Sequence, residues 1–325
     1  MKVIIPAAGL GSRLRPHTYT TPKALLPVAG KPIIGHIMDQ VVGWGGDKVS
    51  IIISHLGDQI ERYIRNNYDI EVDFPVQENV LGLGHAVLTG LEPDDKELLI
   101  ILGDTILDTD LTPVIERKIT TIGVKEVADP RKMGVVVVED GRVTRLIEKP
   151  QDPPSNLAIV GVYYIRDGSL LGKAIGQIIE KDVTVKGEFQ ITDALQLLID
   201  WGEPFEIIPI EGWYDCGRPE TLLETNRYLF DHRSIKSSAP DLKDGMLIEP
   251  VAVGEGASIE RSIIGPYVSI GKDTVIRDSI VRNSIIGNRV KIDNSLLEDT
   301  IISERVDVKG SFRSLNLGSS TQVIL

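Results

Sequence analysis

Residues 3–18 read Val-Ile-Ile-Pro-Ala-Ala-Gly-Leu-Gly-Ser-Arg-Leu-Arg-Pro-His-Thr, an apolar run that leads directly into a glycine-rich segment. We expect a short buried strand over residues 3–5 and then a turn, in which Gly9 and Gly11 can take positive φ and approach a ligand. Successive N–H groups in such a turn form an anion-binding concavity. Arg13, and Lys23 after a proline-fixed loop, add positive charge that can meet phosphate. The stretch predicts a phosphate-binding loop after the first strand.

The spacing in this loop excludes two common nucleotide-binding motifs. A P-loop has lysine and then Ser or Thr directly after its last glycine, and a dinucleotide-binding loop has a third glycine and a later acidic residue. Residues 9–13, Gly-Leu-Gly-Ser-Arg, meet neither condition. With the residues that follow, they resemble the G-x-G-[ST]-R-L-x-P-x-T and P-K signature of sugar-1-phosphate nucleotidyltransferases. The resemblance implies that Arg13 and Lys23 are catalytic and that the loop binds the nucleotide through Ala8, Gly9, Gly11, Ser12 and Arg13.

Composition is that of an ordinary globular chain, with 325 residues, 42% hydrophobic and 25% charged. A net charge of −12 argues against a nucleic-acid partner. No apolar run reaches the roughly 20 residues that span a bilayer, so we expect no membrane association. The single cysteine, Cys216, excludes an intramolecular disulfide. Together with an N-terminus that lacks a signal-peptide layout, it predicts a cytoplasmic protein in which Cys216 is a small buried thiol.

The sequence pattern predicts a first domain over residues 1–233. Apolar runs at 49–54, 98–102 and 207–210 alternate with helical periodicity at 33–44, 59–66 and 192–201, as in a Rossmann-like, mostly parallel α/β sheet. We expect Thr192 and Asp193 to cap the last of these helices. Asp140-Gly141, between two strand-like runs, predicts a hairpin over 134–148. A further helix is expected over 220–233.

Residues 234–245 predict a linker, and residues 246–325 a second domain. Short units of about six residues begin at pairs such as Ile264-Gly265 and Ile270-Gly271, a period that indicates a β-solenoid. This repeat pattern resembles that of hexapeptide-repeat proteins, which form a left-handed parallel β-helix. Acyltransferases of that kind use a histidine base, and residues 233–325 contain no histidine. We therefore expect the β-helix to assemble a homo-oligomer, a dimer, trimer or tetramer. The recurring apolar residues include Val268, Val275, Ile276, Ile292 and Leu296.

Two aspartates are candidates for a metal site, although each taken alone is more often a cap or turn residue. Asp104 follows a buried strand, and ligands of open α/β sheets bind beyond the carboxyl ends of strands. Asp215 lies in the glycine-flanked stretch Trp213-Tyr-Asp-Cys-Gly. Magnesium takes one or two carboxylates together with substrate phosphates. Both aspartates match metal motifs of the nucleotidyltransferase family, which implies an Mg²⁺ cofactor and places Asp104 beside the nucleotide as well.

The segment from Gln77 to Gly82 is the candidate for base recognition. A glutamine amide can read the N3–H and O4 edge of a pyrimidine, and a glycine lets the backbone pass beside a base. From the residues alone, Gln77 is a surface side chain. The resemblance supplies the functional interpretation, because pyrimidine-specific members of the family have Q-x4-G at this place.

A second segment, Glu148-Lys149-Pro150, matches the sugar-phosphate motif of the family. A carboxylate can accept hydrogen bonds from sugar hydroxyls while an ammonium holds phosphate; without the resemblance, the two side chains form a solvated pair. The resemblance implies sugar-phosphate contacts from Glu148 and Lys149, and also from Gly134, Asn156, Ile159, Gly161 and Glu188.

The resemblance is closest to glucose-1-phosphate thymidylyltransferases of the longer type, which carry a β-helical tail. It implies that dTTP and glucose-1-phosphate give dTDP-glucose and pyrophosphate. Two departures concern the base. These enzymes usually have G-L-A-Q-A where this chain has Gly82-Leu-Gly-His-Ala, which is more similar to uridylyltransferases, and G-D-N where it has Gly103-Asp-Thr. The alternatives are a UTP–glucose-1-phosphate uridylyltransferase, a mannose-1-phosphate guanylyltransferase, or a non-catalytic sugar-nucleotide sensor.

Overall fold

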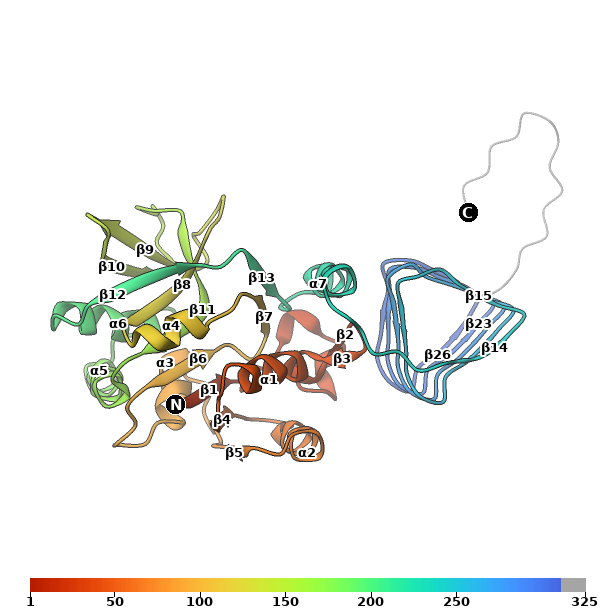
Figure 1. Ribbon diagram of the computed structural model, residues 1–325, viewed down its shortest axis with the longest axis horizontal. Helices are drawn as coiled ribbons and strands as arrows, with labels where there is room; N and C mark the ends of the chain where they lie inside the picture. The colour runs from red at the N-terminus through yellow and green to blue at the C-terminus, as the bar shows by residue number, and fades with distance from the viewer. Residues whose placement is uncertain (311–325) are drawn as a thin grey trace. The chain divides into compact units, whose positions relative to one another are not determined.

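The computed structural model describes residues 1–310, which form two compact units (Figure 1). The first comprises Met1–Leu26 and Lys31–Leu222, and the second comprises Pro27–Gly30 and the chain from Leu223 onward. The division falls within helix α7 (Pro219–His232), so most of this helix groups with the second unit. Composition alone places the boundary after residue 233, at the end of this helix.

A nine-stranded mixed sheet forms the centre of the first unit, with hydrogen-bonded neighbours in the order β10-β9-β11-β6-β1-β4-β5 and with β8 and β12 joined beside β11. Strand β1 pairs in parallel with both β4 and β6, so the carboxyl ends of these three strands meet at one edge. Strand β11 is antiparallel to β6. The Rossmann-like α/β fold is confirmed. The strands are β1 (Lys2–Pro6), β4 (Lys48–Ile52), β5 (Glu71–Asp73), β6 (Leu98–Ile101), β8 (Thr120–Glu126), β9 (Gly134–Glu139), β10 (Arg142–Glu148), β11 (Leu157–Ile165) and β12 (Phe205–Pro209).

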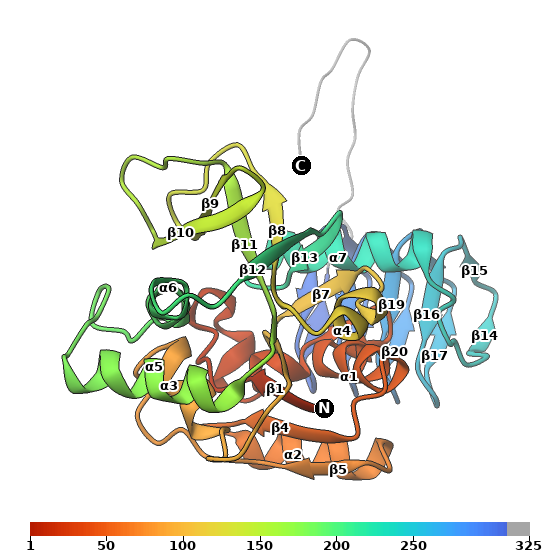
Figure 2. The same cartoon turned by 60° about the vertical axis from the view of Figure 1, so that its left-hand side comes forward.

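The apolar runs of the sequence account for the central strands. Val3, Val49 and Leu98 belong to segments that are buried almost throughout, as parallel strands covered on both faces must be. In Figure 2 the β9–β10 hairpin lies at one side of the sheet, with β4, β5 and α2 at the other. The predicted hairpin turn is present, since Asp140 and Gly141 have φ of 49° and 76°, both in the left-handed region.

The helices predicted over 33–44, 59–66 and 192–201 are confirmed, and the described part of the first unit has three further α-helices that the periodicity did not predict. Together these helices are α1 (Ile33–Gly43), α2 (Gly57–Asn67), α3 (Leu83–Thr89), α4 (Thr112–Arg117), α5 (Gly168–Glu180) and α6 (Ile191–Asp200). The expected cap of α6 by Thr192 and Asp193 is wrong. Gln190 is the N-cap residue and makes no side-chain cap, which leaves the hydroxyl of Thr192 free to bond elsewhere. None of the helices in the described part of the chain has the length and hydropathy of a membrane span.

A coil of short parallel strands forms most of the second unit, consistent with a left-handed β-helix (Figure 1). Paired residues on successive coils are 16 or 17 positions apart, slightly less than three full six-residue units. The core is a column of inward apolar residues such as Ile259, Ile276 and Ile292. Residues at the corners, including Arg261, Asp278 and Asn294, have positive φ. Four short strands of residues 1–310 belong neither to the nine-stranded sheet nor to the coil. They are β2 (Pro27–Val28), β3 (Lys31–Pro32), β7 (Thr105–Asp108) and β13 (Gly212–Asp215).

The coil has three strand stacks with different outer surfaces. The charged stack is β14 (Asp241–Lys243), β17 (Ser258–Glu260), β20 (Val275–Arg277), β23 (Lys291–Asp293) and β26 (Asp307–Lys309). The apolar stack is β15 (Met246–Leu247), β18 (Ile263–Ile264), β21 (Ile280–Val281) and β24 (Leu296–Leu297). The covered stack is β16 (Val251–Val253), β19 (Val268–Ile270), β22 (Ile285–Ile286) and β25 (Ile301–Ile302).

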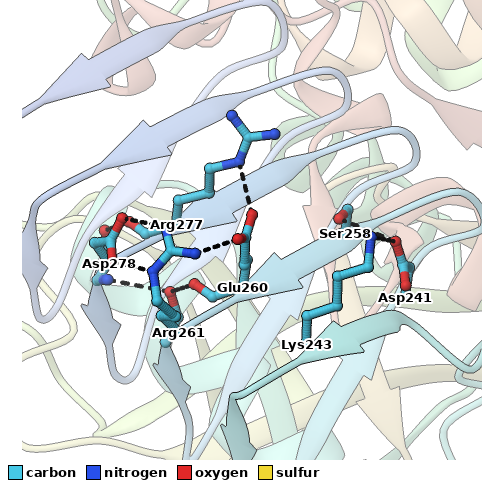
Figure 3. A network of polar contacts seen from close by, with 9 residues as sticks. Asp241, Lys243, Ser258, Glu260, Arg261, Arg277 and Asp278 are labelled. Carbon is cyan, nitrogen blue, oxygen red and sulfur yellow. Dashed lines mark hydrogen bonds and ion pairs between the residues drawn. The ribbon is translucent and has the colours of Figure 1, made fainter.

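Figure 3 shows the outer surface around the charged stack, where Arg277 reaches Glu260 at 3.2 Å and Arg261 reaches Asp278 at 2.7 Å. Strand β14 lies inside residues 234–245, so the end of the expected linker already belongs to the first coil. Leu296 is 79% exposed rather than part of the core, because its neighbour Leu297 takes the inward position of β24. Residues 311–325 of the expected β-helix lie outside the described residues.

Candidate active site

Two aspartates meet at the edge where β1 and β6 end. Asp104 follows β6, and the N–H of Gly103 donates to the carbonyl of Pro6 at 3.0 Å. Strand β13 runs antiparallel to β7 with Asp215 opposite Thr105. The N–H of Cys216 also donates to the carbonyl of Asp104 at 3.0 Å. Two residues 111 positions apart in the chain are thereby held side by side, by backbone pairing rather than by their side chains.

Four charged groups act on one another at this edge. Lys23 makes an ion pair with Asp104, in which the lysine side chain is 14% exposed and the aspartate 36%. Burial raises the pKa of Asp215 above its usual value, and the nearby charge of Asp104 raises it further. The charges of Lys23 and Arg13 lower that pKa in part. Arg13 and Lys23 thus both act on the charge of Asp215, and Lys23 is also ion-paired with Asp104.

The carboxylate pair fits a divalent cation. Burial is the main cause of the raised pKa of Asp215, and the negative charge of Asp104 adds to it; a cation between the two carboxylates would relieve that repulsion. Within residues 1–310 there is no group of three or more His, Cys, Asp or Glu side chains that could hold a metal. A magnesium ion bound by Asp104 and Asp215 would complete its shell with phosphate oxygens and water, which is its common mode of binding.

The loop after β1 contains only one of the two expected left-handed glycines. Gly11 has φ of 61°, and a Cβ there would lie 2.8 Å from Cγ2 of Thr18. The hydroxyl of Thr18 donates to the carbonyl of Gly11 at 2.8 Å, which fixes the turn. Gly9 does not have positive φ, and a Cβ there would meet no atom within 4 Å. The expectation of positive φ at Gly9 is therefore wrong, and neither its conformation nor a close neighbour among the described residues requires glycine there.

The base-recognition segment is closely packed. Gln77 is 2% exposed, so it is not the surface side chain that the residues alone suggest. Its Nε2 lies 3.2 Å from the carbonyl oxygen of Gly82 and 2.9 Å from Nδ1 of His85. Gly82 has φ of 106°, and a Cβ there would lie 2.7 Å from the carbonyl oxygen of Phe189. The close approach that requires glycine at position 82 is thus to the backbone of Phe189.

The sugar-phosphate residues form a second polar group around the end of β10. Thr192 on α6 donates its hydroxyl hydrogen to Glu148 at 2.7 Å, and Lys149 pairs with Glu148 at 3.1 Å. The Glu148 side chain is 8% exposed, while Lys149 is 25% exposed. A Cβ on Gly134 would lie 2.9 Å from Ile159 and 3.0 Å from Oε2 of Glu148. These residues are brought together, with Glu148 buried and hydrogen-bonded and Lys149 more accessible.

Three other residues that were expected to contact the sugar do not belong to the polar group around Glu148. The amide of Asn156 donates to Glu126, and its side chain is exposed. Glu188 accepts from Gln190 at 2.9 Å, and it lies against Gly82 in the base-recognition segment rather than against Glu148. Gly161 has φ of 82°, and a Cβ there would lie 2.3 Å from Leu102. Its place is therefore beside the end of β6, close to Asp104.

Comparison with known proteins identifies the family to which the chain belongs. Residues 2–232 match the family described as nucleotidyl transferase. This chain belongs to that family. A low-salt glycan biosynthesis nucleotidyltransferase, Agl11 of Haloferax volcanii, is 32% identical over 309 residues, which cover 85% of this chain and 84% of that protein. A glucose-1-phosphate thymidylyltransferase of Streptomyces griseus is 30% identical over 310 residues, covering 86% of this chain and 85% of that one.

The structural neighbours of this nucleotidyl transferase agree with its sequence relatives. A crystal structure of a UDP-glucose pyrophosphorylase complexed with UDP-glucose superposes with a TM-score of 0.63 at 27% identity, and covers 71% of this chain and 99% of that chain. The nucleotidyl transferase described here is therefore an enzyme of the sugar-1-phosphate nucleotidyltransferase class.

Sequence reasoning missed the roles of three residues of this nucleotidyl transferase, two of which contact expected site residues and one of which is affected by the charge of such a residue. Thr192 and His85 are the partners of Glu148 and Gln77, and each stands in a helix whose packing the sequence does not reveal. Asp193 has a buried Oδ2 that lacks a hydrogen-bond partner, and burial, aided by the charge of Glu148, raises its pKa. The prediction that Cys216 is a buried thiol is confirmed.

Proposed function

We propose that this enzyme transfers a nucleotidyl group from dTTP to glucose-1-phosphate, giving dTDP-glucose and pyrophosphate. The observation that carries the proposal is the cluster of Arg13, Lys23, Asp104 and Asp215 at the carboxyl ends of β1 and β6. It combines cationic side chains for a triphosphate with a carboxylate pair for a divalent cation. A sensor without catalysis would not need all four groups.

In the proposed reaction, an oxygen of the sugar phosphate attacks the α-phosphorus of the triphosphate, and the bond to the β-phosphate breaks to release pyrophosphate. Such displacements depend on positioning and on neutralisation of charge, with little covalent chemistry from the protein. Arg13 and the N–H groups of the loop hold the triphosphate, and Lys23 draws the phosphates together. Lys149 steers the sugar phosphate. Mg²⁺, held by Asp104 and Asp215, neutralises phosphate charge when it is bound.

UTP is the second candidate nucleotide, and a specific contact favours it. The N–H of Gly84 donates to the carbonyl of Phe189 at 2.8 Å, and a Cβ at position 84 would lie 3.0 Å from that oxygen. The alanine that thymidylyltransferases usually have here would be crowded, so this segment keeps the arrangement that is more similar to uridylyltransferases. Thymine and uracil differ by one methyl group, which is worth roughly 1–3 kcal/mol in a pocket.

We also propose that the second unit assembles the chain into a homo-oligomer. The outward residues of the apolar stack lie in register, Met246 beside Ile263, Ile263 beside Ile280, and Ile280 beside Leu296. Met246 is 57% exposed and Leu296 79%. In the charged stack, outward side chains of opposite charge pair with one another, as Arg277 does with Glu260. Helix α7 packs over the covered stack, where the hydroxyl of Ser269 donates to Oδ1 of Asn226 at 2.7 Å. The apolar stack is the face that association would bury.

The proposed setting is the cytoplasm, on the support of the single cysteine of the sequence, Cys216, which can form no intramolecular disulfide. The reaction is tested by pyrophosphate release over a matrix of dTTP, UTP, CTP, ATP and GTP against several sugar-1-phosphates with Mg²⁺. We expect release with dTTP or UTP and glucose-1-phosphate. Release with a purine nucleotide alone, or with no combination, would overturn the proposal.

A further inference from the structure

The amide group of Gln77 is held in a single orientation by two acceptors. The carbonyl oxygen of Gly82 can only accept a hydrogen bond, so the amide atom 3.2 Å from it must be the nitrogen, Nε2. The same nitrogen lies 2.9 Å from Nδ1 of His85. Since both hydrogens of the amide are directed at these two atoms, Nδ1 must accept. His85 is therefore the tautomer with its proton on Nε2.

This arrangement leaves one polar atom of Gln77 for a ligand. Within the described residues, both side-chain hydrogen bonds of Gln77 are made by Nε2, and Oε1 accepts none. The side chain of Gln77 is 2% exposed. Rotation of its amide group by half a turn would place Oε1 against the carbonyl oxygen of Gly82, so that two acceptors would face each other without a hydrogen between them. A ligand at this segment consequently meets an acceptor and no amide donor.

We infer that His85 is a positioning residue, which locks the amide of Gln77 so that Oε1 alone faces the base and selects for a ring N–H donor. The inference rests on the proposed function and deepens it. Uracil and thymine carry a hydrogen on N3, whereas N3 of cytosine is an acceptor and would face Oε1 with no hydrogen between them. A site built around one buried acceptor rejects a ligand that cannot donate to it.

The backbone around His85 explains why it can reach Gln77. Gly84 lies so close to Phe189 that a side chain is crowded there, and this contact sets the start of α3. His85 follows on the first turn and projects its ring toward the loop of Gln77. The segment Gly82-Leu-Gly-His therefore acts as one unit, in which the glycines allow the approach and the histidine supplies the acceptor.

The test compares kcat/KM for UTP and for dTTP with that for CTP in the full-length enzyme, with glucose-1-phosphate and Mg²⁺. His85→Phe keeps a ring without an acceptor, and His85→Asn places an amide oxygen near the position of Nδ1. We expect His85→Phe to raise the KM for UTP and dTTP and to lower their preference over CTP by about tenfold, the value of one lost hydrogen bond of about 1.4 kcal/mol. The KM for glucose-1-phosphate should stay unchanged, and His85→Asn should restore the preference.

A second arm shows whether His85 acts through Gln77. In a Gln77→Leu background, His85→Phe should change the base preference no further. The inference is overturned if His85→Phe keeps the wild-type preference, if His85→Asn fails to restore it, or if the two substitutions add in full. Wild-type enzyme that uses neither UTP nor dTTP would instead overturn the proposed function. The two failures are thus distinguished by the wild-type rates alone.

Discussion

The ammonium group of Lys23 is ion-paired with the carboxylate of Asp104, which joins the loop after β1 to the loop after β6. Asp215 is the last residue of β13 and pairs with Thr105, the residue directly after Asp104. Because Lys23 already neutralises part of the acidic pair, binding of a metal and a triphosphate would exchange this ion pair for new ones. The groups proposed for catalysis are assembled before substrate arrives.

Asp104→Asn should reduce kcat by at least two orders of magnitude while the fold is retained. The substitution removes a proposed charged metal ligand but keeps the shape of the side chain, the backbone bond from Gly103 to Pro6 and the backbone bond from Cys216 to residue 104. Steady-state pyrophosphate release measures the effect, and thermal unfolding checks the fold. Asp140→Asn, in the hairpin turn, is the matched control and should behave as wild type. Near-normal activity of Asp104→Asn in Mg²⁺ would contradict the metal site.

Lys149→Ala should raise the KM for the sugar phosphate about tenfold or more and change the KM for the nucleotide little. The reason is that Lys149 is ion-paired with Glu148 in the proposed sugar-phosphate site, whereas the proposed triphosphate site contains the separate ion pair of Lys23 and Asp104. Lys132→Ala, an exposed lysine nearby in the chain, serves as the control. Equal increases in both KM values would show that Lys149 has another role.

Gly11→Ala should destabilise the enzyme by about 1–3 kcal/mol, whereas Gly9→Ala should leave its stability within about 0.5 kcal/mol of wild type. Gly11 has positive φ and its new Cβ would press on Thr18, but Gly9 has neither constraint. Urea unfolding of both variants measures the difference. The outcome that counts against this account is a Gly9 variant that is as unstable as the Gly11 variant.

Leu296→Glu should weaken the proposed oligomer, because it places a charge in the exposed column of the apolar stack. Light scattering coupled to size-exclusion chromatography would give the mass of the wild type and of the variant. Lys291→Glu, in the charged stack, should not change that mass. If Leu296→Glu keeps the mass of an oligomeric wild type, another surface makes the contact.

The fold was predictable to the extent that patterns are local. The apolar runs of β1, β4 and β6 and the Asp140-Gly141 turn follow directly from residue types. The start of α6 was not predictable, because Thr192 looks like a cap in the sequence but is bonded to Glu148, 44 positions away. Leu296 likewise looks like a core residue, and only the register of the coil shows that it faces outward.

The candidate site was predictable in its residue types more than in its contacts. Asp104 and Asp215 can be proposed as partners from their motifs, but their approach depends on the antiparallel pairing of β7 with β13. Gln77 looks like a surface residue until its burial against Gly82 and His85 is seen. Asn156 and Glu188 fit the motif, yet their side chains bond Glu126 and Gln190. Long-range pairing decides all of these cases.

The central claim, transfer of a nucleotidyl group at the site of Arg13, Lys23, Asp104 and Asp215, is tested most directly by following isotopic oxygen. Glucose-1-phosphate labelled with ¹⁸O in its phosphate group is incubated with the enzyme, Mg²⁺ and unlabelled dTTP or UTP, and the products are analysed by mass spectrometry. We predict that all of the label appears in the nucleotide-sugar and none in pyrophosphate, because the sugar phosphate is the attacking group. Label in pyrophosphate, or the absence of a nucleotide-sugar with either nucleotide, would contradict the account.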